Sequence, residues 1–425
     1  MKDPYFRTTL VPIVLVLVCP PLVILLWSTV VSLDGSVARL LAPGGFAAVR
    51  RALPSPSFEG LVLAGAFVGV QLTLLLLLPG RVQSGAVTPQ GNQPTYRLNG
   101  VPALFVTHGL FWLGVWAGLY PATIVYDRFG SLLVTLCMFA LVFCAFLHWK
   151  GRHFPSSSDT TLTGNPIFDY FQGVELHPRF FGVDLKQLCN CRLAMMGWGI
   201  IIVSFAAKQR ELFGTVSPGM AVAVALQLAY VLKFFAWEGG YFSSLDITHD
   251  RFGFYLCWGV LCWLPCVYPI ATLYLVRHPA QMSWPAALVL LLFGLGALAL
   301  NYAVDLQRQR VRTHGEIARV WGKPPRLIVA RYRTHEGKER SNVLLASGYW
   351  GLSRHFHYVP ELALALAWTL PVGSTRALPY FYVLFLAILL VDRAGRDDRR
   401  CALKYGLAWA EYRRRVPYKI LPGIY

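Results

Sequence analysis

Long apolar runs separated by short polar segments dominate the chain. A helix needs about 20 mostly apolar residues to cross the hydrocarbon core of a bilayer. Runs near this length recur along the whole sequence, and we expect membrane spans at 11–33, 59–79, 101–123, 131–149, 192–207, 217–237, 252–275, 284–305, 358–374 and 378–391.

These runs predict an all-α, polytopic integral membrane protein with about ten transmembrane helices. Strands of a membrane barrel alternate apolar and polar residues over about ten positions, whereas these runs are unbroken. The runs at 192–207, 358–374 and 378–391 are short, so they are also compatible with re-entrant or tightly paired segments, and the estimate is eight to ten spans. No small-residue cleavage site follows the first run, which we therefore interpret as a retained span.

The composition is typical of a membrane protein, and its positive charge is concentrated in two ranges. Of the 425 residues, 56% are hydrophobic and 14% are charged, compared with about 25% charged in a soluble protein. The net charge of +18 is concentrated in 306–342 and 393–419, beside predicted spans. Basic flanks are typical of cytoplasmic loops, although an anionic ligand is a second interpretation. We expect contact with membrane lipids and no nucleic-acid partner, because no nucleic-acid-binding motif accompanies the basic residues.

The nine cysteines predict neither a disulfide framework nor a metal site. Six of them lie in apolar runs, where reduced thiols behave as small hydrophobes. Cys189 and Cys191 form a lone CxC motif without further ligands nearby in the sequence.

Candidate chemistry gathers towards the C-terminus. The stretch "WGLSRHFHYVPE" holds Arg354, His355, His357 and Tyr358 next to an apolar run. Polar groups at the edge of a bilayer are costly unless they are paired, solvated or used. Few ionisable groups lie within the spans of the first 190 residues. We therefore divide the chain into N-terminal transmembrane helices and loops, 1–190, and a C-terminal catalytic region, 191–425.

Two helical faces carry charge at a spacing of four residues. Arg308 and Arg312 share a face if the preceding helix continues. Such a pair suits a phosphate dianion, but it is also ordinary positive-inside flanking. A second face carries Arg393, Asp397, Cys401 and Tyr405. This combination predicts either a ligand site or a simple ion pair between Arg393 and Asp397.

A short loop between two apolar runs combines acids with a phenol. It contains Tyr241, Asp246, His249 and Asp250, with Glu238 just before them. These are either plain loop residues or proton donors, since an apolar surrounding raises the pKa of a carboxyl group and keeps it protonated at neutral pH.

Two long segments resemble the signatures of the membrane sterol reductases. They are "GNPIFDYFQGVELHPR", Gly164–Arg179, and "DRAGRDDRRCALKYG", Asp392–Gly406. Further segments resemble the members that reduce the 7,8 double bond of 7-dehydrocholesterol-type sterols: "GAVTPQG" at 85–91, "YRLNG" at 96–100, "SFAAKQRE" at 204–211, "LDITHDRFG" at 245–253 and "LLASGYWGLSRHFHY" at 344–358. The chain departs from the usual family residues at Arg308, His177, His357, Asp392 and 360–361.

The resemblance implies a sterol substrate and a C-terminal, cytoplasm-facing pocket for NADPH. It implies that Arg308 and Arg312 hold the adenosine-side phosphates. It further implies that the pocket is lined and completed by Leu345, Trp350, His357, Tyr358, Arg393, Asp397, Cys401, Lys404, Tyr405 and Tyr412. The same resemblance places Tyr241 and Asp397 near the sterol. It also implies the endoplasmic reticulum membrane in a eukaryote, or the inner membrane in a bacterium.

Reduction of an isolated double bond needs protonation coupled to hydride transfer, because nothing stabilises the carbanion that hydride alone would create. We expect Tyr241 to be the acid, with Asp397 as the alternative acid or as an organiser of the nicotinamide side. Reduction of a 14,15 double bond remains an alternative. Weaker alternatives are an S-adenosylmethionine-dependent membrane methyltransferase, whose "RH..Y..E" element Arg354, His355, Tyr358 and Glu361 match, and a non-enzymatic sterol-binding protein.

Overall fold

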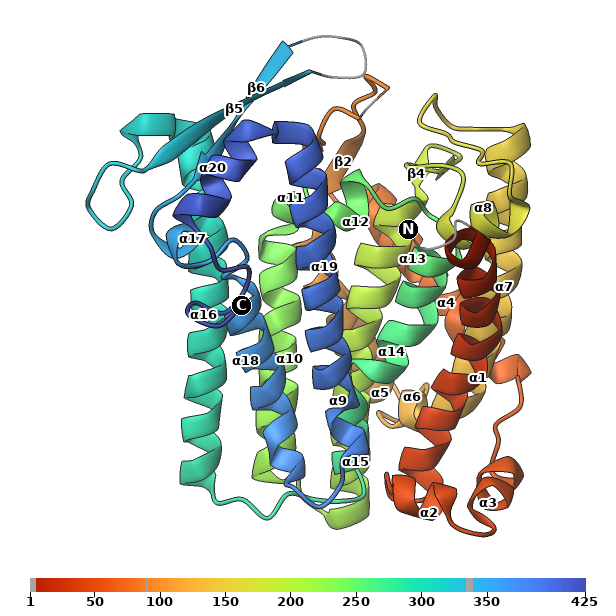
Figure 1. The fold of residues 1–425 in the computed structure, drawn as a ribbon. Helices are drawn as coiled ribbons and strands as arrows, with labels where there is room; N and C mark the ends of the chain where they lie inside the picture. Colours follow the sequence, from red (N-terminus) through yellow and green to blue (C-terminus); the bar gives the residue numbers. More distant parts are fainter. Residues whose placement is uncertain (1–4, 89, 334–338) are drawn as a thin grey trace. The chain divides into compact units, whose positions relative to one another are not determined.

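The computed structural model describes residues 5–88, 90–333 and 339–425. The chain forms two compact units (Figure 1). The first comprises Met1–Met282 and Pro371–Tyr380, and the second comprises Ser283–Leu370 and Phe381–Tyr425. The predicted division at residue 190 concerned chemistry and stays a prediction. Pro89, within the quoted segment 85–91, and residues 334–338, within the basic range 306–342, lie outside the described residues.

The first unit is built from long helices joined by short ones. A π-helical turn, Phe6–Leu10, leads into the first long helix, and another π-helix, Gln187–Met195, leads into α9. The long helices are α1 Val11–Ser32, α4 Phe58–Leu77, α5 Gly100–Trp116, α7 Phe129–His153, α9 Met196–Phe213 and α10 Pro218–Ala236. The last span is a broken run of α13 Phe254–Trp258, a π-helix Gly259–Trp263, α14 Leu264–Val267 and α15 Ile270–Leu275. Short helices are α2 Val37–Leu41, α3 Gly45–Arg51, α6 Ile124–Asp127, α8 Pro166–Gln172, α11 Glu238–Tyr241 and α12 Leu245–Thr248.

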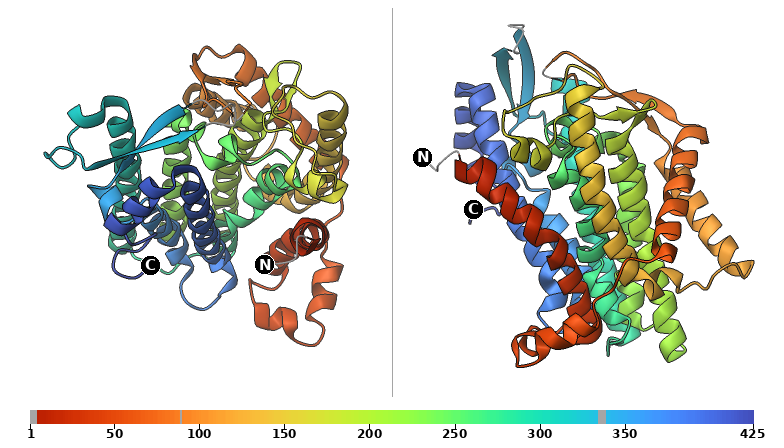
Figure 2. Two further views of the ribbon diagram at one scale, coloured as in Figure 1. Left: turned by 45° about the horizontal axis from the view of Figure 1, so that its top comes forward. Right: turned by 90° about the vertical axis from the view of Figure 1, so that its right-hand side faces the viewer.

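The second unit combines three long helices with a hairpin. Its elements are α16 Trp284–His314, a 3₁₀ turn Gly315–Ile317, β5 Leu327–Arg333, β6 Glu339–Leu345, α17 Tyr349–Leu352, α18 Tyr358–Thr369, α19 Phe381–Tyr405 and α20 Leu407–Arg415. The hairpin lies beside α20 in both views of Figure 2, and the two share a small apolar core of buried residues that includes Ile328, Ala330, Trp409, Tyr412 and Val416.

The described residues contain 8 helices that are long and apolar enough to cross a membrane. Two shorter apolar helices, Gly100–Trp116 and Tyr358–Val372, accompany them. The prediction of an all-α, polytopic membrane protein is confirmed. The prediction that the runs 192–207 and 378–391 are short is wrong. They belong to helices of 27 and 28 residues, Gln187–Phe213 and Leu378–Tyr405. The polar first turns of Gln187–Phe213 are buried, so they are sheltered by protein.

The described part of the chain also forms three small antiparallel ribbons of two strands each, which were not predicted. They are β1 Arg81–Ser84 with β2 Thr95–Leu98, β3 Arg179–Phe180 with β4 Val183–Asp184, and β5 with β6. The last pair lies in the segment expected to be a basic loop, 306–342. Burial alternates along β5, where Ile328 and Ala330 are buried while Val329 is 59% exposed. This period of two is typical of a half-buried strand, but flanking charge obscured it in the sequence.

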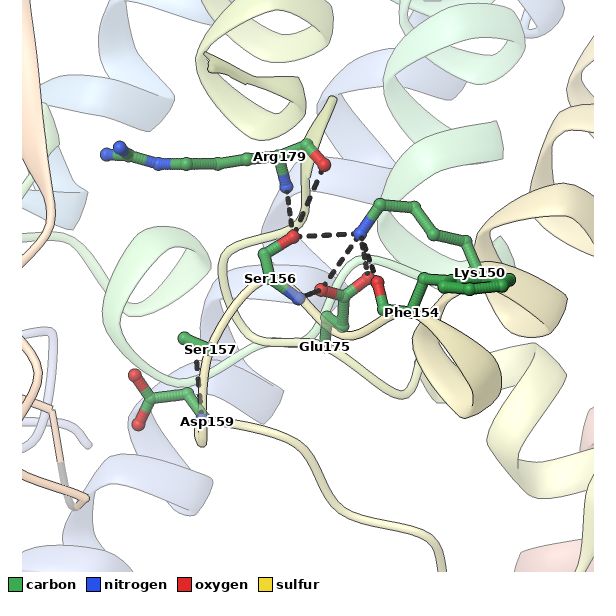
Figure 3. A network of polar contacts seen from close by, with 7 residues as sticks. All are labelled: Lys150, Phe154, Ser156, Ser157, Asp159, Glu175 and Arg179. Atoms are coloured by element: carbon green, nitrogen blue, oxygen red, sulfur yellow. Dashed lines mark hydrogen bonds and ion pairs between the residues drawn. The ribbon is translucent and has the colours of Figure 1, made fainter. Parts of the chain in front are cut away.

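The first signature segment, Gly164–Arg179, is anchored by a buried ion pair (Figure 3). Lys150 Nζ, at the end of α7, lies 2.8 Å from Glu175 Oε2, and both side chains are buried. The Glu175 carboxylate also accepts a hydrogen bond from the backbone N–H of Ser156 at 2.6 Å. The Ser156 hydroxyl in turn accepts the backbone N–H of Arg179 at 2.8 Å. Such a pair is stable when its remaining hydrogen-bonding groups are satisfied, as they are here.

The same segment supplies its own caps and one close backbone crossing. Asn165 caps α8 by accepting the N–H of Ile167 at 3.1 Å, and Asp169 accepts the hydroxyl of Thr163 at 2.7 Å. Gly173 has a φ of +95°, and a Cβ there would lie 2.5 Å from the backbone nitrogen of Gly253. The signature segment therefore packs directly against the backbone at Gly253, which follows the loop that carries Tyr241.

Candidate active site

Tyr241 ends the short helix α11, directly after the span α10. Its side chain is half-buried. Its ring lies 4.8 Å from that of Phe234 and 6.0 Å from that of Phe242, measured between centroids. The phenol therefore sits against aromatic carbon and not in an open polar loop, as a proton donor to an apolar substrate requires.

The loop around Tyr241 is anchored on three sides. Phe242 stacks on Tyr96 with the ring centroids 4.0 Å apart and the planes 1° from parallel. Gln83 Nε2 donates to the carbonyl of Gly239 at 3.1 Å. Lys186 Nζ donates to the carbonyl of Ile247 at 3.0 Å, and burial lowers the pKa of this lysine to about 8. These contacts hold the loop to elements distant in sequence.

A buried polar cluster lies next to Tyr241. Asn190 Nδ2 lies 2.9 Å from the Tyr241 hydroxyl oxygen. Arg192 Nη1 lies 2.7 Å from Glu238 Oε1, and both side chains are almost fully buried. Glu238 also accepts the backbone N–H of Gly100 at 3.0 Å. Burial raises the pKa of Glu238, and the guanidinium of Arg192 opposes this shift. Sequence reasoning missed both residues, because Asn190 precedes the predicted span 192–207 and Arg192 is its first residue, whereas the helix begins at Gln187.

In the second unit, a chain of stacked groups begins on α16. The Arg308 guanidinium lies over the Trp350 ring, 4.2 Å from its centroid. Trp350 is held by its own Nε1–H, which donates to the carbonyl of Val304 at 2.9 Å. Its backbone carbonyl accepts the Tyr412 hydroxyl at 3.2 Å. Leu345 packs in the same buried cluster.

Further aromatic rings follow Trp350 at the N-terminal end of α18. The Trp350 and His357 ring centroids are 5.1 Å apart, and those of His357 and Tyr358 are 4.3 Å apart. Tyr358 stacks on His355 at 5.2 Å with the planes 9° from parallel. His355 Nε2 lies 3.7 Å from Asp397 Oδ2 on α19. Burial lowers the pKa of His355 to about 4, so the imidazole is neutral at physiological pH.

Asp397 lies at the centre of a charged group on α19. Its Oδ1 lies 2.6 Å from Arg400 Nη2, and its Oδ2 lies 3.8 Å from the Cys401 sulfur. A guanidinium at this distance forms a strong charge-assisted bond with the ionised carboxylate. The helix runs unbroken over Phe381–Tyr405, which confirms that Arg393, Asp397, Cys401 and Tyr405 share one face.

The remaining predicted residues face the hairpin or solvent. Lys404 Nζ lies 4.1 Å from the Tyr332 ring centroid on β5, and Asn342 Nδ2 of β6 donates to the Tyr405 hydroxyl at 2.7 Å. Arg312 is exposed, one turn beyond Arg308 on α16. Within the second unit, ring contacts and hydrogen bonds join most of the predicted pocket residues. Tyr241 belongs to the first unit.

Arg354 has a structural role instead. It is buried, and its Nη1 donates to the carbonyls of Val416 at 2.6 Å and Pro417 at 3.0 Å. It therefore fastens the C-terminal segment. Glu361 accepts a hydrogen bond from Asn301 at 3.0 Å, and Asn301 also donates to the carbonyl of His357. Asn301 is the only asparagine in the predicted span 284–305. A polar residue within an apolar run is the sequence signal that could have identified this contact.

The chain is similar to known proteins over almost its whole length. The chain is 44% identical over 412 residues to a 7-dehydrocholesterol reductase of Arabidopsis thaliana, covering 96% of this chain and 95% of the relative. It is 35% identical to a Delta(14)-sterol reductase of Methylotuvimicrobium alcaliphilum, covering 97% and 94%. It is 37% identical to a 7-dehydrocholesterol reductase of Xenopus laevis, covering 88% and 82%.

The profile of the family described as "Ergosterol biosynthesis ERG4/ERG24 family" matches residues 50–425. A match of this extent decides against both the methyltransferase and the non-enzymatic alternatives. The chain therefore belongs to the ergosterol biosynthesis ERG4/ERG24 family, and it is an integral membrane oxidoreductase of the sterol reductase type.

Proposed function

We propose that the protein reduces the 7,8 double bond of 7-dehydrocholesterol-type sterols with NADPH. The observation that carries the choice of double bond is the 44% identity, over 96% of this chain, to a relative named for 7-dehydrocholesterol. The relative named for Delta(14)-sterol reduction is 35% identical. The substrate partner is a sterol dissolved in the membrane, in the endoplasmic reticulum of a eukaryote or the inner membrane of a bacterium.

The residues of the second unit suit NADPH in charge and in shape. Arg308 and Arg312 supply two guanidinium groups one helical turn apart, which complement phosphate. Trp350, His357 and Tyr358 supply adjoining flat rings against which a nicotinamide packs. NADPH, when bound, supplies a hydride to the sterol. Leu345, Arg393, Cys401, Lys404, Tyr405 and Tyr412 complete the proposed pocket.

Tyr241 is the proposed acid. Its hydroxyl protonates carbon 8 of a 5,7-diene, which leaves an allylic cation shared between carbons 7 and 5. The rings of Phe234 and Phe242 place apolar carbon beside the phenol, as suits protonation of an apolar substrate. Asp397 is the proposed organiser of the nicotinamide side, because its carboxylate is held by Arg400 at 2.6 Å and lies 3.7 Å from His355 among the proposed pocket residues.

A substrate competition tests the choice of double bond. Purified protein in lipid vesicles would receive NADPH with equal amounts of 7-dehydrocholesterol and a Δ14-unsaturated sterol, and the products would be separated by gas chromatography. We expect 7-dehydrocholesterol to be converted to cholesterol first. Consumption of the Δ14 sterol with 7-dehydrocholesterol untouched would establish the second candidate, Δ14 reduction, which the 35% identical relative favours.

A further inference from the structure

Asn190 occupies a position that packing alone does not explain. It lies in the π-helix Gln187–Met195, and its side chain is 3% exposed. Its Nδ2 donates to the Tyr241 hydroxyl oxygen at 2.9 Å, across 51 residues of sequence. Its Oδ1 is buried and has no hydrogen-bond partner among the described residues. A half-satisfied buried amide is destabilising, so a leucine of similar size would serve the fold better.

The distance between Asn190 and Tyr241 is fixed by a rigid clamp. Arg192 lies two residues after Asn190 and forms an ion pair at 2.7 Å with Glu238, three residues before Tyr241. Arg192 Nη2 also donates to Asn99 Oδ1 at 2.7 Å. The helix that carries the amide and the helix that carries the phenol are therefore bound to each other. A π-helical turn is an energetically unfavoured feature that often marks a functional position.

Resting on the assignment of Tyr241 as the acid, we propose that Asn190 is the positioning residue of the proton donor. The amide N–H occupies a lone pair of the phenol oxygen, so the hydroxyl hydrogen points away from Asn190 and is the hydrogen that the reaction transfers. When the O–H bond breaks and a C–H bond forms at carbon 8, the phenol oxygen keeps the electron pair. The same N–H then stabilises the phenolate until water returns a proton.

Two variants separate this role from packing. Asn190→Leu removes both polar atoms, and Asn190→Asp keeps an acceptor but loses the N–H donor. We expect both to lower kcat about 10- to 100-fold, the equivalent of one hydrogen bond to a charged group, with an unchanged KM for NADPH. Normal turnover by Asn190→Asp would show that Asn190 accepts from the phenol, and the proposal would be wrong.

A double-mutant cycle supplies a readout that a merely structural role would not produce. In a Tyr241→Phe background the phenol oxygen is absent, so Asn190→Leu should cause no further loss of kcat. If the two losses multiply instead, Asn190 acts independently of Tyr241 and the proposal fails. Gln83→Leu is a matched control, because Gln83 also donates an amide hydrogen bond to this loop, at the carbonyl of Gly239, but not to the phenol. Its effect should multiply with that of Tyr241→Phe.

A titration of Tyr241 tests whether Asn190 donates a hydrogen bond to the phenol, and this test does not depend on the identity of the sterol substrate. 3-Fluorotyrosine placed at position 241 would be followed by fluorine NMR against pH in purified protein. Asn190→Leu should move the midpoint upward by about one pH unit, because the phenolate loses a donor; Gln83→Leu should leave it in place. The charged and titratable groups on the elements around the phenol are the same in all these variants: Glu238, Asp246, His249, Asp250, Arg192 and Lys186. An unmoved midpoint would overturn the proposal, whereas absence of sterol reduction by the wild type would overturn only the proposed function.

Discussion

Tyr241 and Asp397, the two predicted acids, have different surroundings. The Tyr241 hydroxyl accepts from a neutral amide and sits against aromatic rings, whereas Asp397 lies 2.6 Å from a guanidinium. A phenol that accepts a hydrogen bond keeps its own hydrogen to donate. A carboxylate held by arginine is a hydrogen-bond acceptor instead. At the scale of single residues, these contacts support the proposal of Tyr241 as the donor and Asp397 as the organiser.

Tyr241→Phe removes the hydroxyl and keeps the ring. We expect turnover to fall about 10²- to 10⁴-fold, the usual contribution of a positioned general acid. The KM for NADPH should stay unchanged, because the Tyr241 hydroxyl is not among the groups proposed to hold the cofactor. Steady-state kinetics with purified protein measure both. Turnover close to that of the wild type would transfer the acid role to Asp397 or to a bound water.

Asp397→Asn should behave differently from Tyr241→Phe. Loss of the charge breaks the contact with Arg400 and disturbs His355, 3.7 Å away. We therefore expect weaker NADPH binding together with lower turnover. Equilibrium titration of cofactor fluorescence measures the binding directly. Unaltered NADPH affinity in this variant would remove Asp397 from the proposed pocket.

Arg308 and Arg312 are expected to recognise the phosphate that distinguishes NADPH from NADH. Replacing both by alanine should raise the KM for NADPH far more than that for NADH, since each charge-assisted hydrogen bond is worth about 1.5–3 kcal/mol. Arg310→Ala is the matched control, because Arg310 is exposed and lies on the same helix but not on the same face. Equal effects of the double variant on the KM for NADPH and for NADH would mean that these arginines only mark the cytoplasmic side of the helix.

At the scale of elements, the ion pair between Arg192 and Glu238 joins a membrane span to the loop that follows α10. Both side chains are almost fully buried, so removing one partner leaves an uncompensated charge. Gly100 makes the approach possible, because a Cβ there would lie 2.3 Å from the Phe235 ring and 2.8 Å from Glu238 Oε2. The ion pair between Arg192 and Glu238 therefore depends on three segments that are distant in sequence, those that carry Gly100, Arg192 and Glu238.

Arg192→Met should destabilise the protein by about 3–5 kcal/mol, the usual cost of breaking a buried pair. Arg39→Ala serves as the control, because Arg39 pairs with Asp34 where both side chains are exposed, at 58% and 43%, and such a pair is worth at most about 1 kcal/mol. Unfolding in detergent, followed by tryptophan fluorescence, compares the two. Equal midpoints would mean that the clamp contributes no more than a surface contact.

At the scale of the whole molecule, each unit contains a buried neutral histidine. Burial lowers the pKa of His177 to about 4, and that of His355 is lowered for the same reason. An unfolded histidine has a pKa of about 6.5, so below that pH the unfolded chain binds more protons than the folded one. The stability that these neutral histidines provide is therefore complete above about pH 6.5 and declines as the pH falls towards 4.

This difference predicts an acid-sensitive protein. The unfolding midpoint should be constant from pH 7 to 8 and fall steadily between about pH 6.5 and 4. His177→Gln should flatten part of this decline while keeping an acceptor for the Tyr96 hydroxyl, which lies 3.2 Å from His177 Nδ1. Thermal scans at half-unit pH steps provide the test. A decline as steep in the variant as in the wild type would exclude His177 as a source.

The sequence by itself determined the membrane-spanning fold, the helical faces and the family. Hydropathy and helical spacing are local properties, so the spans, the Arg308–Arg312 pair and the Arg393–Tyr405 face could be predicted from residues close in the chain. The burial alternation in β5 and the full length of the helix Gln187–Phe213 could not, because charge and buried polar residues masked them. Only the tertiary structure placed Asn190 against Tyr241 and Arg192 against Glu238. These contacts depend on how distant helices pack, and no local pattern encodes which buried polar groups will meet.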